Sequence, residues 1–207
     1  MIKSYYNSYI KSVNQVLSQL LITDRNGKQI EQGDSFARLC DYSSSIQSNC
    51  LTQFFCGNGA SSSIADHMAL DWTKNGKVKS MSFGSSAILS AVSNDLGADH
   101  FFSAPLSWHA KSGDLLVAVS SSGNSENIIK AVEYAIQNEM KVVTFSGLRP
   151  DNKLRSMGDI NLYTKAHTYG IVECAHQILL HTWLDQFMQV EEWSIEDFQN
   201  MRQNHLN

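Results

Sequence analysis

Short apolar runs alternate with helical stretches between residues 51 and 163, and this alternation constrains the fold more than any other feature. The clearest strand covers 115–119, and a polar loop and a helical pattern over 126–137 follow it directly. Strands that alternate with helices form a parallel sheet with helices on both faces. Because ligands bind beyond the carboxyl ends of such strands, a functional loop should follow a strand and open a helix.

The same pattern predicts the remaining elements. We expect strands at 51–56, 78–83, 141–145 and 160–163, and helices at 61–72, 85–92, 153–157 and 172–190. Apolar residues at helical spacing over 4–21 and 34–47 predict an N-terminal helical hairpin. The expected organisation is one α/β domain over 1–207. It comprises a hairpin (1–50), a three-layer αβα core around a mostly five-stranded parallel sheet (51–192) and a C-terminal tail (193–207).

Composition and charge limit the functions open to the chain. The net charge is −4 and no dense Lys/Arg block occurs, so a nucleic-acid partner is not expected. The N-terminus lacks the apolar core of a signal peptide, and no stretch is apolar enough to span a bilayer. The four cysteines form no CxxC pair and are expected to be reduced and buried. These features predict a cytoplasmic protein without a membrane partner.

Two loops follow a predicted strand and open a predicted helix. In the first, Gly57-Asn58-Gly59 allows a tight turn, and the serines from Ser61 onward lie at a helix start. This pattern fits an anion site, and it also fits an ordinary turn with a serine cap.

The second loop, residues 120–125, has the sequence Ser-Ser-Ser-Gly-Asn-Ser. Its four hydroxyls lie beside the free N–H groups and the partial positive charge of a helix N-terminus. Such a loop can hold a phosphate without a lysine. Capping of the helix by Ser125 is the alternative, although four hydroxyls exceed what one cap requires.

A set of histidines and carboxylates lies on two predicted helices. His67 and Asp71 are four residues apart and share a helix face, a spacing that suits two metal ligands, an acid–base pair or a surface pair. Glu173 and His181 lie about two turns apart on the last helix. Glu173 also fits a charge that the helix dipole favours, and His181 also fits a core histidine.

Taken together, these motifs resemble the sugar isomerase (SIS) domain family, and within it the bacterial phosphoheptose isomerases. The resemblance covers essentially the whole chain. The matching segments, in order, are Gly57-Asn58-Gly59, the helix with His67, Val92-Ser93-Asn94-Asp95, Ser120 to Ser125, and the helix from Glu173 to His181. The resemblance implies the SIS fold.

The resemblance also implies an activity and a site. It implies an aldose–ketose isomerase that converts sedoheptulose 7-phosphate, or a related sugar phosphate, to an aldoheptose 7-phosphate through an enediol. The implied active site lies at the subunit interfaces of a tetramer, with Asp71, Glu173 and His181 moving protons. The implied zinc ligands are His67, Asp71, Glu173 and His181. The implied phosphate ligands are Ser61, Ser120, Ser121, Ser122 and Ser125, and Asn58 and Asp95 would contact sugar hydroxyls.

Three positions depart from the family pattern. Asp71 stands where the family usually has glutamate, which retracts the base by more than about 1 Å, a displacement that can cost about a hundredfold in rate. Glu173 stands where the family usually has glutamine, and a second carboxylate would strengthen metal binding. The loop over 166–172 lacks the family's Asp-Arg pair and contains the unmatched His167.

These departures leave two other functions open. Some SIS proteins are tetrameric adaptors that lack a catalytic set, including one that binds a replication initiator. The His/carboxylate set weighs against that function. A sugar-phosphate-sensing regulator would usually add a DNA-binding domain, and no basic helix-turn-helix is evident in the sequence.

Overall fold

A six-stranded sheet forms the centre of the computed structural model, which describes residues 4–191. The strand order is β1-β6-β5-β4-β2-β3, and all neighbouring pairs are parallel except β1 with β6. The strands are β1 (Leu21–Thr23), β2 (Gln53–Gly57), β3 (Ser80–Ser82), β4 (Leu115–Ser120), β5 (Lys141–Gly147) and β6 (Ile160–Thr164). The predicted parallel sheet is confirmed. The predicted tail over 193–207 lies outside the described residues.

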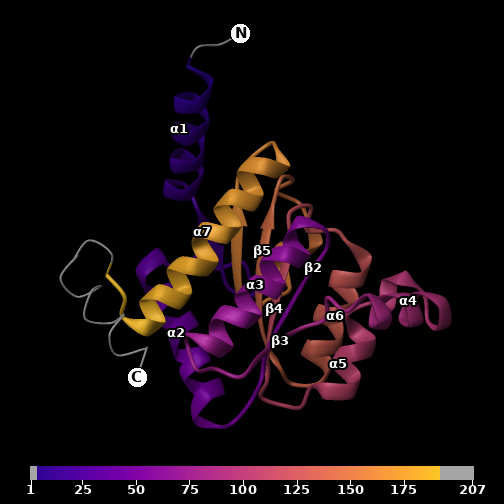
Figure 1. Ribbon diagram of the computed structural model, residues 1–207. Coiled ribbons are helices and arrows are strands. Elements are labelled where there is room, and N and C mark those ends of the chain that lie inside the picture. Colours follow the sequence, from indigo (N-terminus) through magenta and orange to yellow (C-terminus); the bar gives the residue numbers. More distant parts are fainter. Residues whose placement is uncertain (1–3, 192–207) are drawn as a thin grey trace.

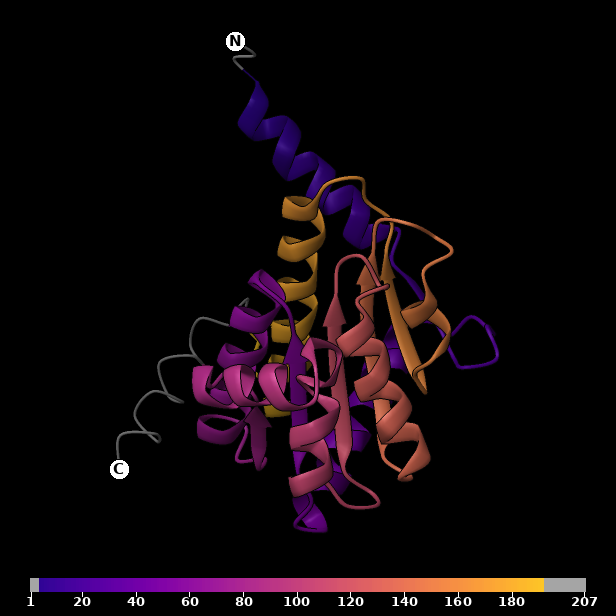
Figure 2. The same cartoon turned by 90° about the vertical axis from the view of Figure 1, so that its right-hand side faces the viewer.

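Helices cover both faces of this sheet and complete three layers (Figures 1 and 2). They are α1 (Tyr5–Ser18), α2 (Gln32–Ser48), α3 (Ala60–Lys74), α4 (Ser86–Asp95), α5 (Ser103–His109), α6 (Glu126–Gln137) and α7 (Tyr169–Met188). Apolar residues of α2, α3 and α7 share one buried cluster with the sheet. Residues of α5 and α6 share a second cluster, on the opposite face. The predicted αβα architecture is confirmed.

The N-terminal region contains both predicted helices, and a short strand lies between them. The strand β1 adds an antiparallel edge beside β6. Three residues are too few to give a recognisable alternation, so the sequence pattern did not reveal it. Both helices pack against α7, and α1 projects from the body of the molecule (Figures 1 and 2). Tyr5, Tyr6 and Ile10 on α1 are exposed.

Two further differences from the sequence-based expectation concern α5 and the cysteines. The pattern did not predict α5, which contains Pro105 in its first turn, where a helix tolerates proline. All four cysteines are free, as expected, but only Cys56 is buried: Cys40 is partly buried, and Cys50 and Cys174 are exposed. No helix among residues 4–191 is both long and apolar enough to cross a membrane.

The order of the strands creates a switch point between β2 and β4. From β2 the chain moves outward to β3 and then returns to form β4 on the other side of β2. The helices that follow β2 and β4 are α3 and α6, and they pack on opposite faces of the sheet. The loops that follow β2 and β4 therefore lead to opposite faces of the sheet. They leave from the carboxyl ends of these strands, where open α/β sheets bind ligands.

The contact between α3 and α7 has an aromatic core. The rings of Trp72 on α3 and Trp183 on α7 are both fully buried and meet edge to face, with centroids 5.2 Å apart. Phe187 on α7 adds a second contact, with its ring centroid 5.0 Å from that of Trp72. Aromatic pairs of this kind add stability beyond their buried area, so they hold the two helices at a fixed spacing.

Candidate active site

The glycine loop between β2 and α3 requires glycine at two positions. A Cβ at Gly57 would lie 2.5 Å from the carbonyl oxygen of Ser61, so only glycine permits this close approach. Gly59 has φ 55°, which favours glycine. The turn buries Ser61 in the first turn of α3. The loop therefore brings α3 tightly against the end of β2.

The serine loop between β4 and α6 contains hydroxyls that do not cap the helix. Ser125 is the N-cap residue of α6, yet its side chain accepts no capping hydrogen bond. Its hydroxyl lies 3.4 Å from that of Ser120, which also accepts from the N–H of Gly123 at 3.2 Å. These contacts order the loop and do not satisfy the helix N–H groups. The capping alternative therefore lacks its expected hydrogen bond.

The short 3₁₀ turn over Lys153–Ser156 packs against the serine loop and is hydrogen-bonded to it. Gly123 has φ 64°, and a Cβ there would lie 2.0 Å from Oδ1 of Asn152. The N–H of Leu154 donates to the carbonyl of Gly123 at 3.0 Å, and the N–H of Lys153 donates to Oδ1 of Asn124 at the same distance. The conformation of the loop is therefore fixed from two sides.

Ser121 and Ser122 complete the loop in different environments. The carbonyl of Ser121 accepts from the N–H of Gly147 at 3.1 Å, and its buried hydroxyl has no partner among residues 4–191. The hydroxyl of Ser122 is partly exposed and accepts from the N–H of Asn124 at 3.3 Å. Buried hydroxyls are normally paired, so the hydroxyl of Ser121 has capacity for a further hydrogen bond.

Two asparagines connect the glycine loop and the serine loop across the switch point. Nδ2 of Asn58 donates to Oδ1 of Asn127 at 2.8 Å, and Nδ2 of Asn127 donates back to Oδ1 of Asn58 at 2.9 Å. Asn127 lies in the first turn of α6. Sequence reasoning named Asn58 and missed Asn127, because the pairing depends on the adjacency of β2 and β4. Each amide keeps one N–H for another partner.

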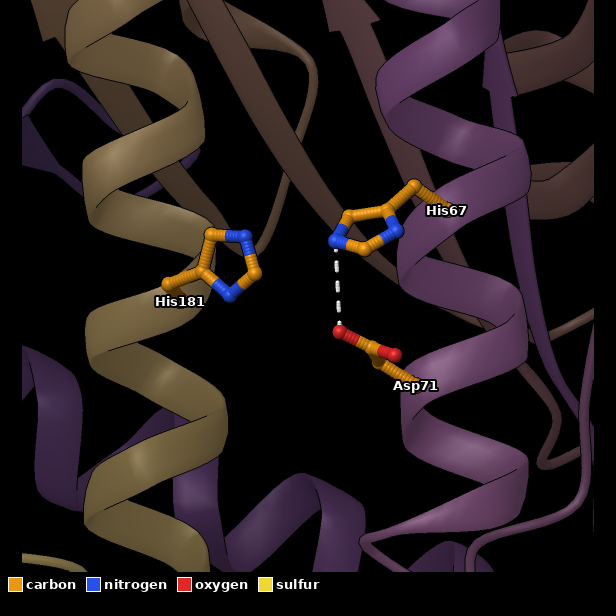
Figure 3. A group of neighbouring side chains, drawn as sticks. All are labelled: His67, Asp71 and His181. Atoms are coloured by element: carbon orange, nitrogen blue, oxygen red, sulfur yellow. Dashed lines mark ion pairs between the residues drawn. The ribbon is translucent and has the colours of Figure 1, made fainter.

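Three of the expected metal-binding residues converge on the facing sides of α3 and α7 (Figure 3). Nε2 of His67 lies 3.3 Å from Oδ2 of Asp71, and the ring centroids of His67 and His181 are 5.2 Å apart. One ligand atom from each residue lies within 4.8 Å of the others. The side chain of His67 is 44% exposed and that of Asp71 is 18% exposed, so the group remains open to solvent.

The donor set fits a zinc ion. Bonds of about 2.0–2.1 Å in a tetrahedral shell place neighbouring ligand atoms about 3.4 Å apart. The separation of 3.3 Å between His67 and Asp71 already matches this spacing. Two imidazole nitrogens and one carboxylate oxygen are ordinary zinc ligands, and they leave a fourth position for a further ligand.

Glu173 and Asp95 lie apart from this three-residue group. Glu173 is eight residues before His181 on α7, which places their Cα atoms about 12 Å apart along the helix axis. Near it, a hydrogen bond with Cys174 raises the pKa of Tyr9 on α1, and the carboxylate of Glu173 contributes to the same shift. Asp95 is exposed at the end of α4 and accepts from the amide of Asn94 at 2.7 Å.

His176 was not among the predicted site residues, although it lies on α7 between Glu173 and His181. It is fully buried, and its Nε2 lies 3.2 Å from the carbonyl oxygen of Ser146 at the end of β5. A histidine within the apolar face of a helix was the only signal in the sequence. His167, the unmatched residue before α7, is exposed.

The comparisons with known proteins agree with this fold. A family model described as SIS domain matches residues 8–147. A phosphoheptose isomerase of Neisseria gonorrhoeae is 33% identical over 139 residues, which is 63% of this chain and 70% of that protein. A phosphoheptose isomerase of Buchnera aphidicola is 32% identical over 167 residues, which is 78% of this chain and 83% of that protein.

Solved structures share this fold. The phosphoheptose isomerase GmhA from Neisseria gonorrhoeae superposes with a TM-score of 0.77 at 24% identity, covering 90% of this chain and 96% of that one. A phosphoheptose isomerase from Francisella tularensis gives 0.76 at 26% identity, covering 90% and 95%. The chain therefore belongs to the SIS domain family. Its similarity to phosphoheptose isomerases groups it with the isomerase enzymes of that family.

Proposed function

We propose that this protein is an aldose–ketose isomerase that converts sedoheptulose 7-phosphate, or a related sugar phosphate, to the aldoheptose 7-phosphate. The observation that carries the proposal is the convergence of His67, Asp71 and His181 from two facing helices of a SIS fold. The similarity to phosphoheptose isomerases supports the choice of substrate.

The loops at the switch point provide the phosphate site of this proposal. The phosphate ligands are the hydroxyls of the two loops: Ser61, Ser120, Ser121, Ser122 and Ser125. N–H groups at the start of α6 add donors and a favourable dipole. The remaining amide N–H groups of the Asn58–Asn127 pair donate to sugar hydroxyls, and Asp95 is a further candidate contact from α4.

The helix α3 links the phosphate site to the reacting carbons. Ser61 lies in its first turn, and His67 follows six residues later, about 9 Å further along the axis. A sugar phosphate carries its phosphate at one end of the chain and the isomerised carbons at the other. This spacing therefore supports a substrate that extends along α3.

Proton transfer is assigned to Asp71 and His181, with Glu173 as a second carboxylate. A carboxylate beside the C–H bond can move a proton between adjacent carbons of an open-chain sugar, which passes through an enediol. An imidazole exchanges the hydroxyl proton near neutral pH. Asp71 is partly buried beside His67, which limits the positions that its carboxylate can take.

Zinc is the proposed cofactor, held by His67, Asp71 and His181, with Glu173 as the proposed fourth ligand. When bound, zinc would polarise the substrate carbonyl and favour negative charge on its oxygen. For Glu173 to reach the same ion, its side chain must extend along α7 toward His181.

We further propose a cytoplasmic homotetramer with its sites at subunit interfaces. The exposed side chains of Tyr5, Tyr6 and Ile10 on the projecting helix α1 support self-association, because such an apolar surface favours a partner. Size-exclusion chromatography with light scattering measures the oligomer directly.

A coupled assay with sedoheptulose 7-phosphate and added zinc tests the activity. Aldoheptose 7-phosphate should form in the parent protein and fall sharply in His181→Ala. A failure of the zinc-loaded parent to form any aldose would exclude the heptose assignment. The position of Glu173 outside the three-residue group favours a non-catalytic SIS adaptor as the second candidate. Under that function, the biological role would survive in both Asp71→Ala and His181→Ala.

A further inference from the structure

His176 makes a hydrogen bond that is unusual for the apolar face of a helix. Its side chain is fully buried between α7 and the sheet, where its ring meets that of Phe145 edge to face, with centroids 5.9 Å apart. Nε2 lies 3.2 Å from the carbonyl oxygen of Ser146. Because a carbonyl only accepts, Nε2 carries the proton and Nδ1 is the unprotonated nitrogen of a neutral ring.

The environment of His176 keeps this ring neutral. Burial lowers its pKa to about 4, and the hydrogen bond to Ser146 offsets only part of that effect. Among residues 4–191, no charged group contributes to the shift. A protonated ring would also need an acceptor for Nδ1, which has no partner within residues 4–191. The donor therefore stays on Nε2 throughout the neutral pH range.

The hydrogen bond of His176 to Ser146 is adjacent, along β5, to a contact with the serine loop. Ser146 pairs with Ser120 in the ladder between β5 and β4. The next residue, Gly147, donates its N–H to the carbonyl of Ser121 at 3.1 Å. A Cβ at Gly147 would lie 2.6 Å from Val172 of α7, so the end of β5 is pressed against this helix. A continuous path therefore runs from α7 through the end of β5 to the serine loop.

Buried polar atoms without partners are concentrated at the same strand ends. They include the hydroxyls of Ser121, Ser146 and Thr164 and Nδ1 of His176. In the ladder, Thr164 on β6 pairs with Gly147 on β5. Leaving such groups unpaired costs stability, so a polar ligand or ordered water is expected where they gather. The carboxyl end of the sheet is therefore better suited to binding a polar ligand than to core packing.

We infer that His176 is a positioning residue for phosphate binding. It holds the carboxyl end of β5 against α7, and through Gly147 it sets the position of Ser121 in the serine loop. The same helix carries His181, so His176 also fixes the phosphate site relative to the three-residue group. This inference rests on the proposed role of the serine loop in binding phosphate.

Two substitutions at His176 distinguish the effect of its hydrogen bond from the effect of its packing. His176→Leu keeps a similar volume and removes the donor, whereas His176→Gln places an amide N–H near the position of Nε2. We expect His176→Leu to weaken binding of inorganic phosphate by about tenfold, the effect of one lost hydrogen bond. His176→Gln should recover most of that loss. Zinc affinity should stay unchanged in both, because neither substitution alters a ligand.

Calorimetric titration with inorganic phosphate measures this effect without any turnover. A parent that binds phosphate but isomerises no sugar would contradict the proposed function and still allow the inference to be tested. An active parent whose His176→Leu variant is folded and binds phosphate as tightly would overturn the inference alone. A parent that does not bind phosphate would overturn it as well.

A measurement on the unmodified protein covers the case in which His176→Leu does not fold. NMR of ¹⁵N-histidine-labelled protein should show His176 as the neutral Nε2–H tautomer between pH 6 and 8. Its nitrogen chemical shifts should move when phosphate is added, because the ring and the serine loop are both hydrogen-bonded to the end of β5, at Ser146 and Gly147. Histidine shifts that do not respond to saturating phosphate would overturn the inference.

Discussion

The imidazole rings of His67 and His181 face each other from α3 and α7 with their centroids 5.2 Å apart and their planes inclined by 58° (Figure 3). The two helices carrying them are held by buried aromatic contacts. The spacing of the rings is therefore a property of the hydrophobic core. A site fixed in this way is preorganised before any ligand binds, which favours catalysis.

The first prediction concerns metal binding. Removing one imidazole in His67→Ala or His181→Ala leaves at most two residues of the group, so zinc affinity should fall by roughly 100-fold or more. Equilibrium dialysis with zinc measures the change. Asp66→Asn is the matched control, because it neutralises an exposed carboxylate on the same helix outside the group. Unchanged zinc affinity in both histidine variants would place the metal elsewhere.

The second prediction ranks the two carboxylates as the base. Asp71 lies in the three-residue group and Glu173 does not. We therefore expect Asp71→Asn to lower kcat by about 100-fold or more, the contribution typical of general base catalysis. Glu173→Gln should lower kcat by less than about tenfold in the same assay. The opposite ranking, measured with zinc saturating, would assign the base to Glu173.

The third prediction concerns the backbone of the serine loop. In Gly123→Ala the new Cβ would collide with Asn152, so the loop must move, and phosphate binding should weaken by about tenfold or more. Gly27→Ala is a matched control, because Gly27 also has positive φ but a Cβ there would have no atom of residues 4–191 within 4 Å. The control should lose about 1 kcal/mol of unfolding free energy and keep full phosphate affinity. Equal phosphate affinity in the two variants would contradict the prediction.

The fourth prediction concerns the pair formed by Asn58 and Asn127. Either single alanine variant leaves the other amide without its two hydrogen bonds, and the double variant removes both groups. A double-mutant cycle on unfolding free energy should give a coupling of about 0.5–1.5 kcal/mol. Strictly additive effects would mean that the pair does not hold the two loops together.

The fifth prediction follows from the pKa of His176. Folding lowers this pKa from 6.5 to about 4, so the unfolded chain binds more protons between these values. Stability should therefore be complete above about pH 6.5 and decrease as the pH falls toward 4, by up to about 3 kcal/mol. Urea unfolding across this range measures the slope. The slope should be shallower in His176→Gln, and identical slopes would contradict the prediction.

The sequence predicted most of the sheet because its strands are apolar and alternate with helices. It also placed His67 and Asp71 on one helix face, since a spacing of four residues determines that relation directly. The contact of His181 with this pair was expected only from the family resemblance. Helix spacing alone does not tell which two helices face each other across a core.

Other features escaped prediction because they depend on contacts between distant parts of the chain. Asn127 has meaning only beside Asn58, and their loops become neighbours only when β4 forms next to β2. The role of His176 depends on a carbonyl that belongs to β5. The strand β1 is too short to carry a pattern of its own. Tertiary contacts, and not local sequence, decide the first two, and the short length of β1 decides the third.

The edge-to-face contact of Trp72 and Trp183 has a practical consequence. These indoles follow Asp71 by one residue and His181 by two, and both are fully buried. Indole emission depends on nearby charge and on the polarity around the ring. The chain therefore carries an optical reporter beside its three-residue group, and arrival of a cation should change its fluorescence without any added label.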